Sequence, residues 1–122
     1  MTPEERAVIV RRRSLSPIDF EGLKIFDYTA GTTGSSSLAV IEVPPGAVHA
    51  KAWSKRSDKY YLVTAGSVRF EIDESAADLD SGDFCLVRQG QRFSYSNPNA
   101  KPAVLVLVHT PSFDLDAEVF VV

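Results

Sequence analysis

Residues 46–66 read GAVHAKAWSKRSDKYYLVTAG, and residues 82–97 read GDFCLVRQGQRFSYSN. Both stretches begin at a glycine and contain short apolar runs, Tyr60–Ala65 in the first and Phe84–Val87 in the second. Short runs rich in aromatic and β-branched residues, bounded by glycine, are typical of β-strands. The two stretches therefore predict neighbouring pieces of β-structure that end in tight turns.

The rest of the chain continues this pattern. Further apolar or alternating runs occur at 38–43, 67–73, 104–108 and 117–122, and residues 31–37 form a glycine- and serine-rich loop. No internal segment keeps the period of an α-helix, and only Thr2, Pro3 and Glu5 could begin one, immediately before the strand-like run Ala7–Val10. Many short strands separated by turns predict an all-β sandwich or barrel, and 122 residues suit one domain over residues 1–122.

Composition excludes several classes of protein. The net charge is −3, and the one basic cluster, Arg11–Arg13, is interpreted as a solvated strand end, so no nucleic-acid partner is expected. No apolar run is long enough to span a membrane, and the N-terminus lacks the pattern of a signal peptide. Cys85 is the only cysteine, which rules out a disulfide within the chain and favours a cytoplasmic location.

The two stretches resemble the paired motifs of the cupin superfamily, G-x5-H-x-H-x4-E-x6-G and G-x5-P-x-G-x2-H-x3-N. Gly46 and Gly66 fit the first motif; Gly82, Gly90 and Asn97 fit the second, without insertion and with 15 residues between the motifs. The resemblance implies a small single-domain cupin, which is a double-stranded β-helix, also called a jelly-roll barrel.

The metal-ligand positions depart from the family pattern. In cupins, two histidines, a glutamate and a third histidine bind a divalent metal; here these positions hold Ala52, Ser54, Lys59 and Phe93. Alanine and phenylalanine cannot ligate, serine is a poor ligand, and lysine would first have to lose its proton. We therefore expect no metal and no other cofactor.

The interior of such a barrel is expected to form an organic pocket. Alternation along the strands points one set of side chains inward: Ala52, Ser54, Lys59, Tyr61, Phe93 and Tyr95. An aromatic cavity with one amine and two phenols suits a small ligand with an anionic or carbonyl group. Alternatively, Lys59 is a structural cation bonded to tyrosine hydroxyls or to a buried carboxylate.

The two histidines have different expected roles. His49 is expected on a loop at the rim of the barrel. His109 ends the strand 104–108 and is a candidate catalytic base paired with an aspartate or tyrosine, as the resemblance to metal-free sugar epimerases of related fold implies. A relocated metal held by both histidines is a weaker alternative.

Three functions remain open from the sequence. The first is a metal-independent protein that binds a small organic molecule. The second is an isomerase, epimerase or cyclase that uses Lys59, Tyr61, Tyr95 or His109 as acid or base. The third is a non-catalytic interaction module with a filled barrel. The family resemblance also implies a homodimer, with the runs 7–10 and 119–122 as strands that could join a partner's sheet.

Overall fold

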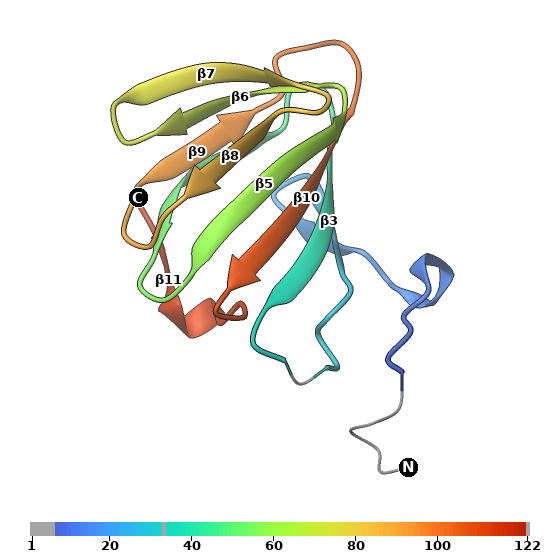
Figure 1. The fold of residues 1–122 in the computed structure, drawn as a ribbon. Coiled ribbons are helices and arrows are strands. Elements are labelled where there is room, and N and C mark those ends of the chain that lie inside the picture. Colours follow the sequence, from blue (N-terminus) through green and yellow to red (C-terminus); the bar gives the residue numbers. More distant parts are fainter. Residues whose placement is uncertain (1–6, 33, 122) are drawn as a thin grey trace.

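The computed structural model describes residues 7–32 and 34–121, and its strands form two antiparallel sheets. One sheet has six strands in the order β1-β2-β3-β10-β5-β8, and the other has five in the order β11-β4-β9-β6-β7. Figure 1 shows the sheets facing one another, with β10 between β3 and β5. This architecture confirms the expected all-β, cupin-like jelly roll.

Most strands are joined to the next strand along the chain by a short turn. The strands of the six-stranded sheet are β1 (Ile18–Phe20), β2 (Leu23–Asp27), β3 (Ser37–Val43), β5 (Asp58–Ala65), β8 (Phe84–Val87) and β10 (Ala103–Thr110). Those of the other sheet are β4 (Val48–Ser54), β6 (Ser67–Ile72), β7 (Ser75–Asp80), β9 (Phe93–Ser96) and β11 (Glu118–Phe120). Two 3-10 turns complete the fold, η2 (Arg12–Ser14) and η3 (Leu115–Ala117). No helix in the described part of the chain is long and apolar enough to cross a membrane.

Alternation on β10 builds much of the core. Ala103, Leu105, Leu107 and His109 are buried, whereas the residues between them are partly exposed on the outer face. The Val104–Val108 run is therefore apolar on both faces of one strand. The inward set packs against side chains from the second sheet, including Val68 and Phe70 of β6, so the core lies between the sheets.

Two positions of the motif frame have clear structural reasons. Gly66 has φ +69°, and a Cβ there would lie 2.5 Å from the carbonyl oxygen of Pro102, so only glycine fits this turn. Asn97 is fully buried, and its side-chain amide donates to the carbonyls of Val43 and Lys101. These contacts tie the end of β9 to the end of β3.

The two terminal runs compare differently with the expectation. The run Ala7–Val10 is not a strand, and its Val8 and Ile9 side chains are exposed; the expected helix start at residues 2–5 lies outside the described residues. At the other end, β11 pairs with β4 of the same chain, Glu118 opposite Ser54 and Phe120 opposite Ala52. As the edge strand of its sheet, β11 has no neighbour on its other side among the described residues, and addition to a partner's sheet stays a prediction.

Candidate functional site

The six residues expected to face inward are all buried between the sheets. Ala52 and Ser54 come from β4, Lys59 and Tyr61 from β5, and Phe93 and Tyr95 from β9. Each is no more than 3% exposed. Their functional role remains a prediction, but the fold brings them to one interior.

Lys59 is the centre of a buried polar cluster. Its ammonium forms an ion pair with Oε1 of Glu118 and donates a hydrogen bond of 2.9 Å to Nε2 of His109. The register of the β5–β10 strand pair explains the hydrogen bond to His109, since Lys59 and His109 lie directly opposite one another. The Lys59 and Glu118 side chains are 4% and 5% exposed, and burial lowers the pKa of Lys59 although Glu118 opposes that shift. Of the two sequence-based expectations for Lys59, the structure shows the cation bonded to a buried carboxylate, and not a charge left free for a ligand.

His109 is held neutral by its surroundings. Burial, and then the charge of Lys59, lower the pKa of His109 to about 3, so Nε2 stays available as an acceptor at neutral pH. The side chain of Phe113 packs edge-on against the imidazole, with ring centroids 5.1 Å apart. The expected Asp or Tyr partner of His109 is not found among the described residues; its hydrogen-bond partner is Lys59.

The lowered pKa of His109 predicts acid sensitivity. As pH falls from about 6.5 towards 3, the unfolded chain takes up a proton at His109 while the folded protein does not, so the free energy of unfolding falls. One such site contributes a slope of at most about 1.4 kcal/mol per pH unit. His109→Gln keeps an acceptor for Lys59 but cannot titrate, so we expect a shallower slope in urea unfolding between pH 7 and pH 4. Equal slopes for both proteins would contradict a neutral, buried His109.

His49 lies inside the barrel and not on a rim loop, which corrects the sequence-based expectation. The β4–β9 register contains a bulge between His49 and Ala52, opposite Tyr95 and Phe93 respectively. The extra residue changes which side chains face inward, since a strand otherwise alternates strictly. The imidazole stacks on Tyr95 and lies against Phe93, with centroids 5.0 Å away in each case.

One hydrogen bond fixes the tautomer of His49. Nδ1 lies 2.7 Å from the carbonyl oxygen of Ala50, which can only accept, so Nδ1 carries the proton. Nε2 then presents a lone pair, and no other described residue forms a hydrogen bond with it. Burial lowers the pKa of His49, which favours the neutral, basic form. His49 therefore has the chemistry of a general base.

Two buried polar atoms have no hydrogen-bond partner among the described residues. They are the phenol oxygen of Tyr95 and Oε2 of Glu118. The ring of Tyr95 lies 5.7 Å from that of Tyr61, centroid to centroid. Burial raises the pKa of Tyr61, and Tyr95, Cys85 and Glu118 raise it further. A buried polar atom without a partner costs about 1–3 kcal/mol, and such atoms in native proteins often mark functional sites.

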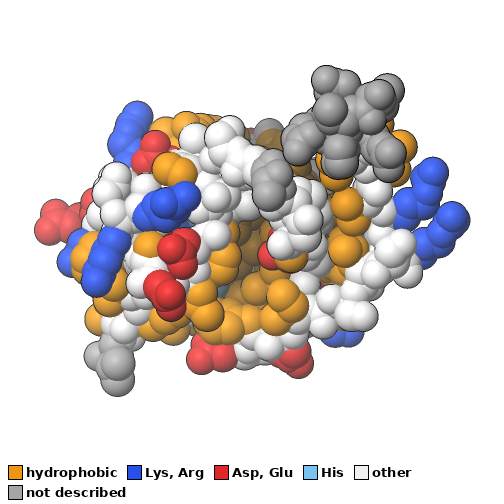
Figure 2. Space-filling model, turned by 90° about the horizontal axis from the view of Figure 1, so that it is seen from below, with side chains coloured by type: hydrophobic (Ala, Val, Ile, Leu, Met, Phe, Trp, Pro, Cys, Tyr) orange, Lys and Arg blue, Asp and Glu red, His pale blue; other side chains and the backbone are white. Residues whose placement is uncertain are grey.

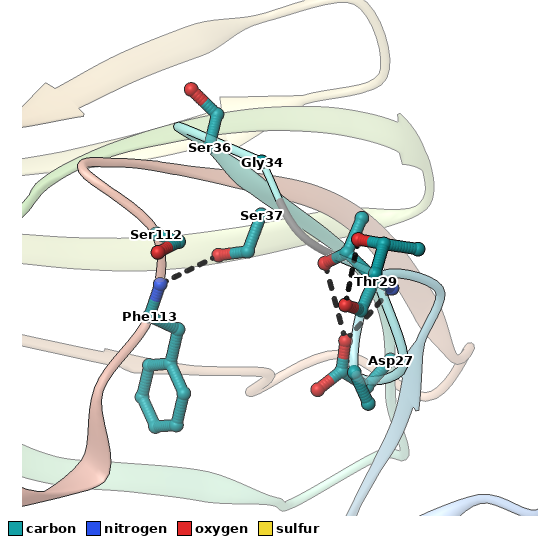
Figure 3. Close-up of a pocket in the computed structure, with 9 residues that line it drawn as sticks. Asp27, Thr29, Gly34, Ser36, Ser37, Ser112 and Phe113 are labelled. Atoms are coloured by element: carbon teal, nitrogen blue, oxygen red, sulfur yellow. Dashed lines mark hydrogen bonds between the residues drawn. The ribbon is translucent and has the colours of Figure 1, made fainter. Parts of the chain in front are cut away.

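At one end of the barrel β10 finishes and β5 begins, and Lys59 and His109 lie opposite one another near these strand ends. Seen from that end, the surface is hollowed at its centre and rimmed largely by hydrophobic side chains (Figure 2). A small polar pocket of about 150 Å³ also lies at the loop between β2 and β3, with Asp27, Ser37 and Phe113 among its walls. Figure 3 shows Phe113 in this pocket with its backbone N–H donating to Ser37. Phe113 thus lies between this pocket and His109.

The interior does not fit the divalent metal that the cupin resemblance implies. Its former ligand positions hold two non-ligating side chains, a serine and the Lys59 ammonium, whose positive charge opposes a cation. The relocated site considered for His49 and His109 is not formed either. The described residues bring no three His, Cys, Asp or Glu side chains together, and Nε2 of His109 is already bonded to Lys59.

Glu118 is the residue that the sequence interpretation missed. It lies far beyond both motifs, in the apolar run 117–122, of which only residues 119–122 were given a role, as a strand that could join a partner's sheet. The usable signal was the single acidic residue within that apolar run, because a charge among apolar strand residues requires a buried partner. Lys59 was the one candidate partner placed inside the barrel.

Several solved structures are similar to this chain. Pac13, described as a unique nucleoside dehydratase, has a TM-score of 0.83 and 19% identity over 95% of this chain and 92% of its own. Three Streptomyces Pac13 variants, one histidine-to-glutamine and two tyrosine-to-phenylalanine, are recorded with uridine. An oxalate decarboxylase from Lactobacillus farciminis in complex with formate has a TM-score of 0.75 and 17% identity, over 89% of this chain and 34% of that one.

At these identities the likeness supports the fold and not the activity. The cupin domain of Schizosaccharomyces pombe Cnp3 is similar in the same way, with a TM-score of 0.73 and 19% identity over 87% of this chain and 70% of that one. No curated protein matches the chain in sequence. The family model described as a cupin domain does match, over residues 39–109, which include both glycine-bounded stretches. The chain therefore belongs to the cupin domain family.

Proposed function

We propose that the barrel binds a small organic molecule without a metal, in the interior between His49, Lys59, Tyr61 and Tyr95. The observation that carries this proposal is the pair of buried, unpartnered polar atoms, Tyr95 Oη and Glu118 Oε2. A ligand that forms hydrogen bonds with both atoms would remove the free-energy cost of burying them without partners. In a barrel that is filled and purely structural, these two atoms would have no role. This disfavours the alternative of a non-catalytic interaction module.

The walls of this interior suit a ligand with a planar ring. The ring centroids of His49 and Phe93 are 5.0 Å apart. The ring centroid of Phe20 on β1 lies 5.6 Å from that of His49 and 5.6 Å from that of Phe120 on β11. Aromatic side chains bind ring faces through stacking. A nucleoside combines such a ring with several hydroxyls, so a nucleoside-sized compound is our first choice.

The spacing of polar residues supports the same choice. The two tyrosines replaced in the Pac13 variants are 34 residues apart, and the replaced histidine precedes the first by 13. Tyr61 and Tyr95 are also 34 residues apart, and His49 precedes Tyr61 by 12. In this chain all three lie in one interior, and Tyr95 contacts both other rings.

A second function, acid–base catalysis on the bound molecule, is favoured by the geometry of His49. We infer that its Nε2 removes a proton from a carbon beside a carbonyl group. The C–H electron pair forms a C=C bond as the neighbouring C–O bond breaks, and the departing oxygen takes the proton from the His49 imidazolium and leaves as water. Isomerisation or epimerisation shares the first step and differs only in where the proton returns.

Binding is tested by titrating the protein with uridine, followed by calorimetry and by two-dimensional NMR. We expect saturable binding, with the largest shifts at residues around His49 and Tyr95, and the same affinity after treatment with a metal chelator. Shifts confined to the outer faces of the sheets, or binding lost with the chelator, would contradict the proposal. Cytidine and adenosine provide matched ligands that differ only in the base.

A homodimer through the six-stranded sheet is part of the proposed function. The outer face of this sheet exposes large apolar side chains, Tyr60 and Leu62 on β5 and Phe84 on β8, at 37%, 40% and 53%. An exposed apolar patch on a soluble protein marks an interaction surface, and a second copy offers the same patch about a two-fold axis. We expect Leu62→Asp to convert a dimer to a monomer in analytical ultracentrifugation.

The matched control for that prediction is Ala76→Asp, which places the same charge on exposed β7 of the other sheet. It is expected to leave the mass in solution unchanged. A wild-type protein that is monomeric at micromolar concentration would contradict the dimer, and so would a Leu62→Asp protein that stays dimeric.

A further inference from the structure

The buried charges of the site cancel, which constrains the ligand. Lys59 is the only buried lysine or arginine of the described residues, and Glu118 is its ion-pair partner. Burial lowers the pKa values of His49 and His109, so neither supplies a positive charge at neutral pH. An anionic ligand would therefore enter an interior with no free cation to meet it.

The unpartnered oxygen of Glu118 adds a second constraint. Oε1 is held by Lys59, while Oε2 is buried without a donor. An ionised carboxylate accepts hydrogen bonds and repels other anions. The missing partner is thus a hydrogen-bond donor, and a hydroxyl group on the ligand meets that need.

We propose that Glu118 is a specificity-determining residue, whose free oxygen accepts a hydrogen bond from a hydroxyl of a neutral ligand and rejects anionic ones. This inference rests on the proposed small-molecule site. It replaces the sequence-based expectation that Lys59 recruits an anionic group. The substrate class is a neutral hydroxylated compound of nucleoside size.

The experiment compares neutral and charged probes of one shape. Uridine, its 5′-carboxylate and the 2′-, 3′- and 5′-deoxy analogues are titrated into the wild-type protein and into Glu118→Gln. In the wild type we expect the carboxylate to bind at least about tenfold more weakly than uridine, and one deoxy analogue to lose about tenfold to a hundredfold, as for a hydrogen bond to a charged group. In Glu118→Gln both differences should shrink.

A second variant covers the case in which Glu118→Gln does not fold, since it leaves Lys59 buried without its counter-charge. Lys59→Met/Glu118→Gln has neither charge and should also lose the discrimination between uridine and its carboxylate. Tighter binding of the carboxylate than of uridine by the wild type would overturn the role of Glu118 and leave the small-molecule site standing. No binding of any probe would overturn both.

Discussion

Replacing Lys59 with methionine is expected to lower the free energy of unfolding by about 3–5 kcal/mol. The side chains of Lys59 and Glu118 are almost fully buried, so solvent does not screen their attraction. Removing the ammonium leaves a buried carboxylate with neither oxygen paired, and removes the donor to His109. Urea unfolding followed by tryptophan fluorescence measures the loss.

The same argument predicts a partial rescue. Lys59→Met/Glu118→Leu removes both charges, and apolar replacements of a buried ion pair are often neutral for stability. The double variant should therefore recover most of the stability lost by Lys59→Met. Lys24→Met, at an exposed position of β2, is the control and should change stability by less than about 0.5 kcal/mol. A Lys59→Met protein as stable as the wild type would contradict the buried ion pair.

The stability of Lys59→Met also determines which variants can test the role of Lys59 in ligand binding. A loss of ligand binding in Lys59→Met alone is ambiguous, because that protein is expected to be partly unfolded. The Lys59→Met/Glu118→Leu protein separates the two effects, since it folds but lacks both polar groups. The structural and functional interpretations of Lys59 are therefore not exclusive: the same ion pair stabilises the barrel and orients Glu118.

The scaffold could be predicted because its determinants are particular residue types at fixed spacing along the chain. Gly66 and Asn97 occupy positions where backbone conformation or a buried amide leaves no alternative, and such requirements are visible as spacing. The inward direction of Lys59 and Tyr95 followed from the period of a strand together with the geometry that the cupin resemblance implies. Strands β1, β2 and β7 were not predicted, because their sequences are short and mixed in polarity, and pairing with neighbouring strands defines them.

The chemistry of the site was less predictable because it depends on non-local contacts. Pairing with β9 produces the bulge that turns His49 inward, and the sequence of residues 49–52 gives no sign of that bulge. The partner of Lys59 is 59 residues away, on a strand for which the sequence indicated no contact with the interior. Period-two reasoning fails at a bulge, and sequence spacing carries no information about which distant carboxylate reaches a buried amine.

His49→Gln is expected to lower turnover by about 10²- to 10⁴-fold, the contribution of a positioned general base, while the ligand is still bound. Glutamine has a similar reach and can keep a hydrogen bond to the Ala50 carbonyl, but it cannot take a proton at neutral pH. The loss should therefore fall on kcat and leave KM within a few-fold.

The measurement uses β-hydroxy aldehydes and ketones of nucleoside size, with the conjugated product followed by ultraviolet absorbance. In heavy water, the wild type should also exchange the hydrogen beside the carbonyl, and His49→Gln should not. The alternative base, His109, predicts the opposite pattern, in which His109→Gln loses the exchange and His49→Gln keeps it. His109 is the weaker base, because Lys59 occupies its Nε2 and both burial and that charge lower its pKa, whereas Nε2 of His49 has no such partner among the described residues. Exchange that persists in His49→Gln would therefore move the base to another residue, and absence of exchange in the wild type would leave binding as the function of the barrel.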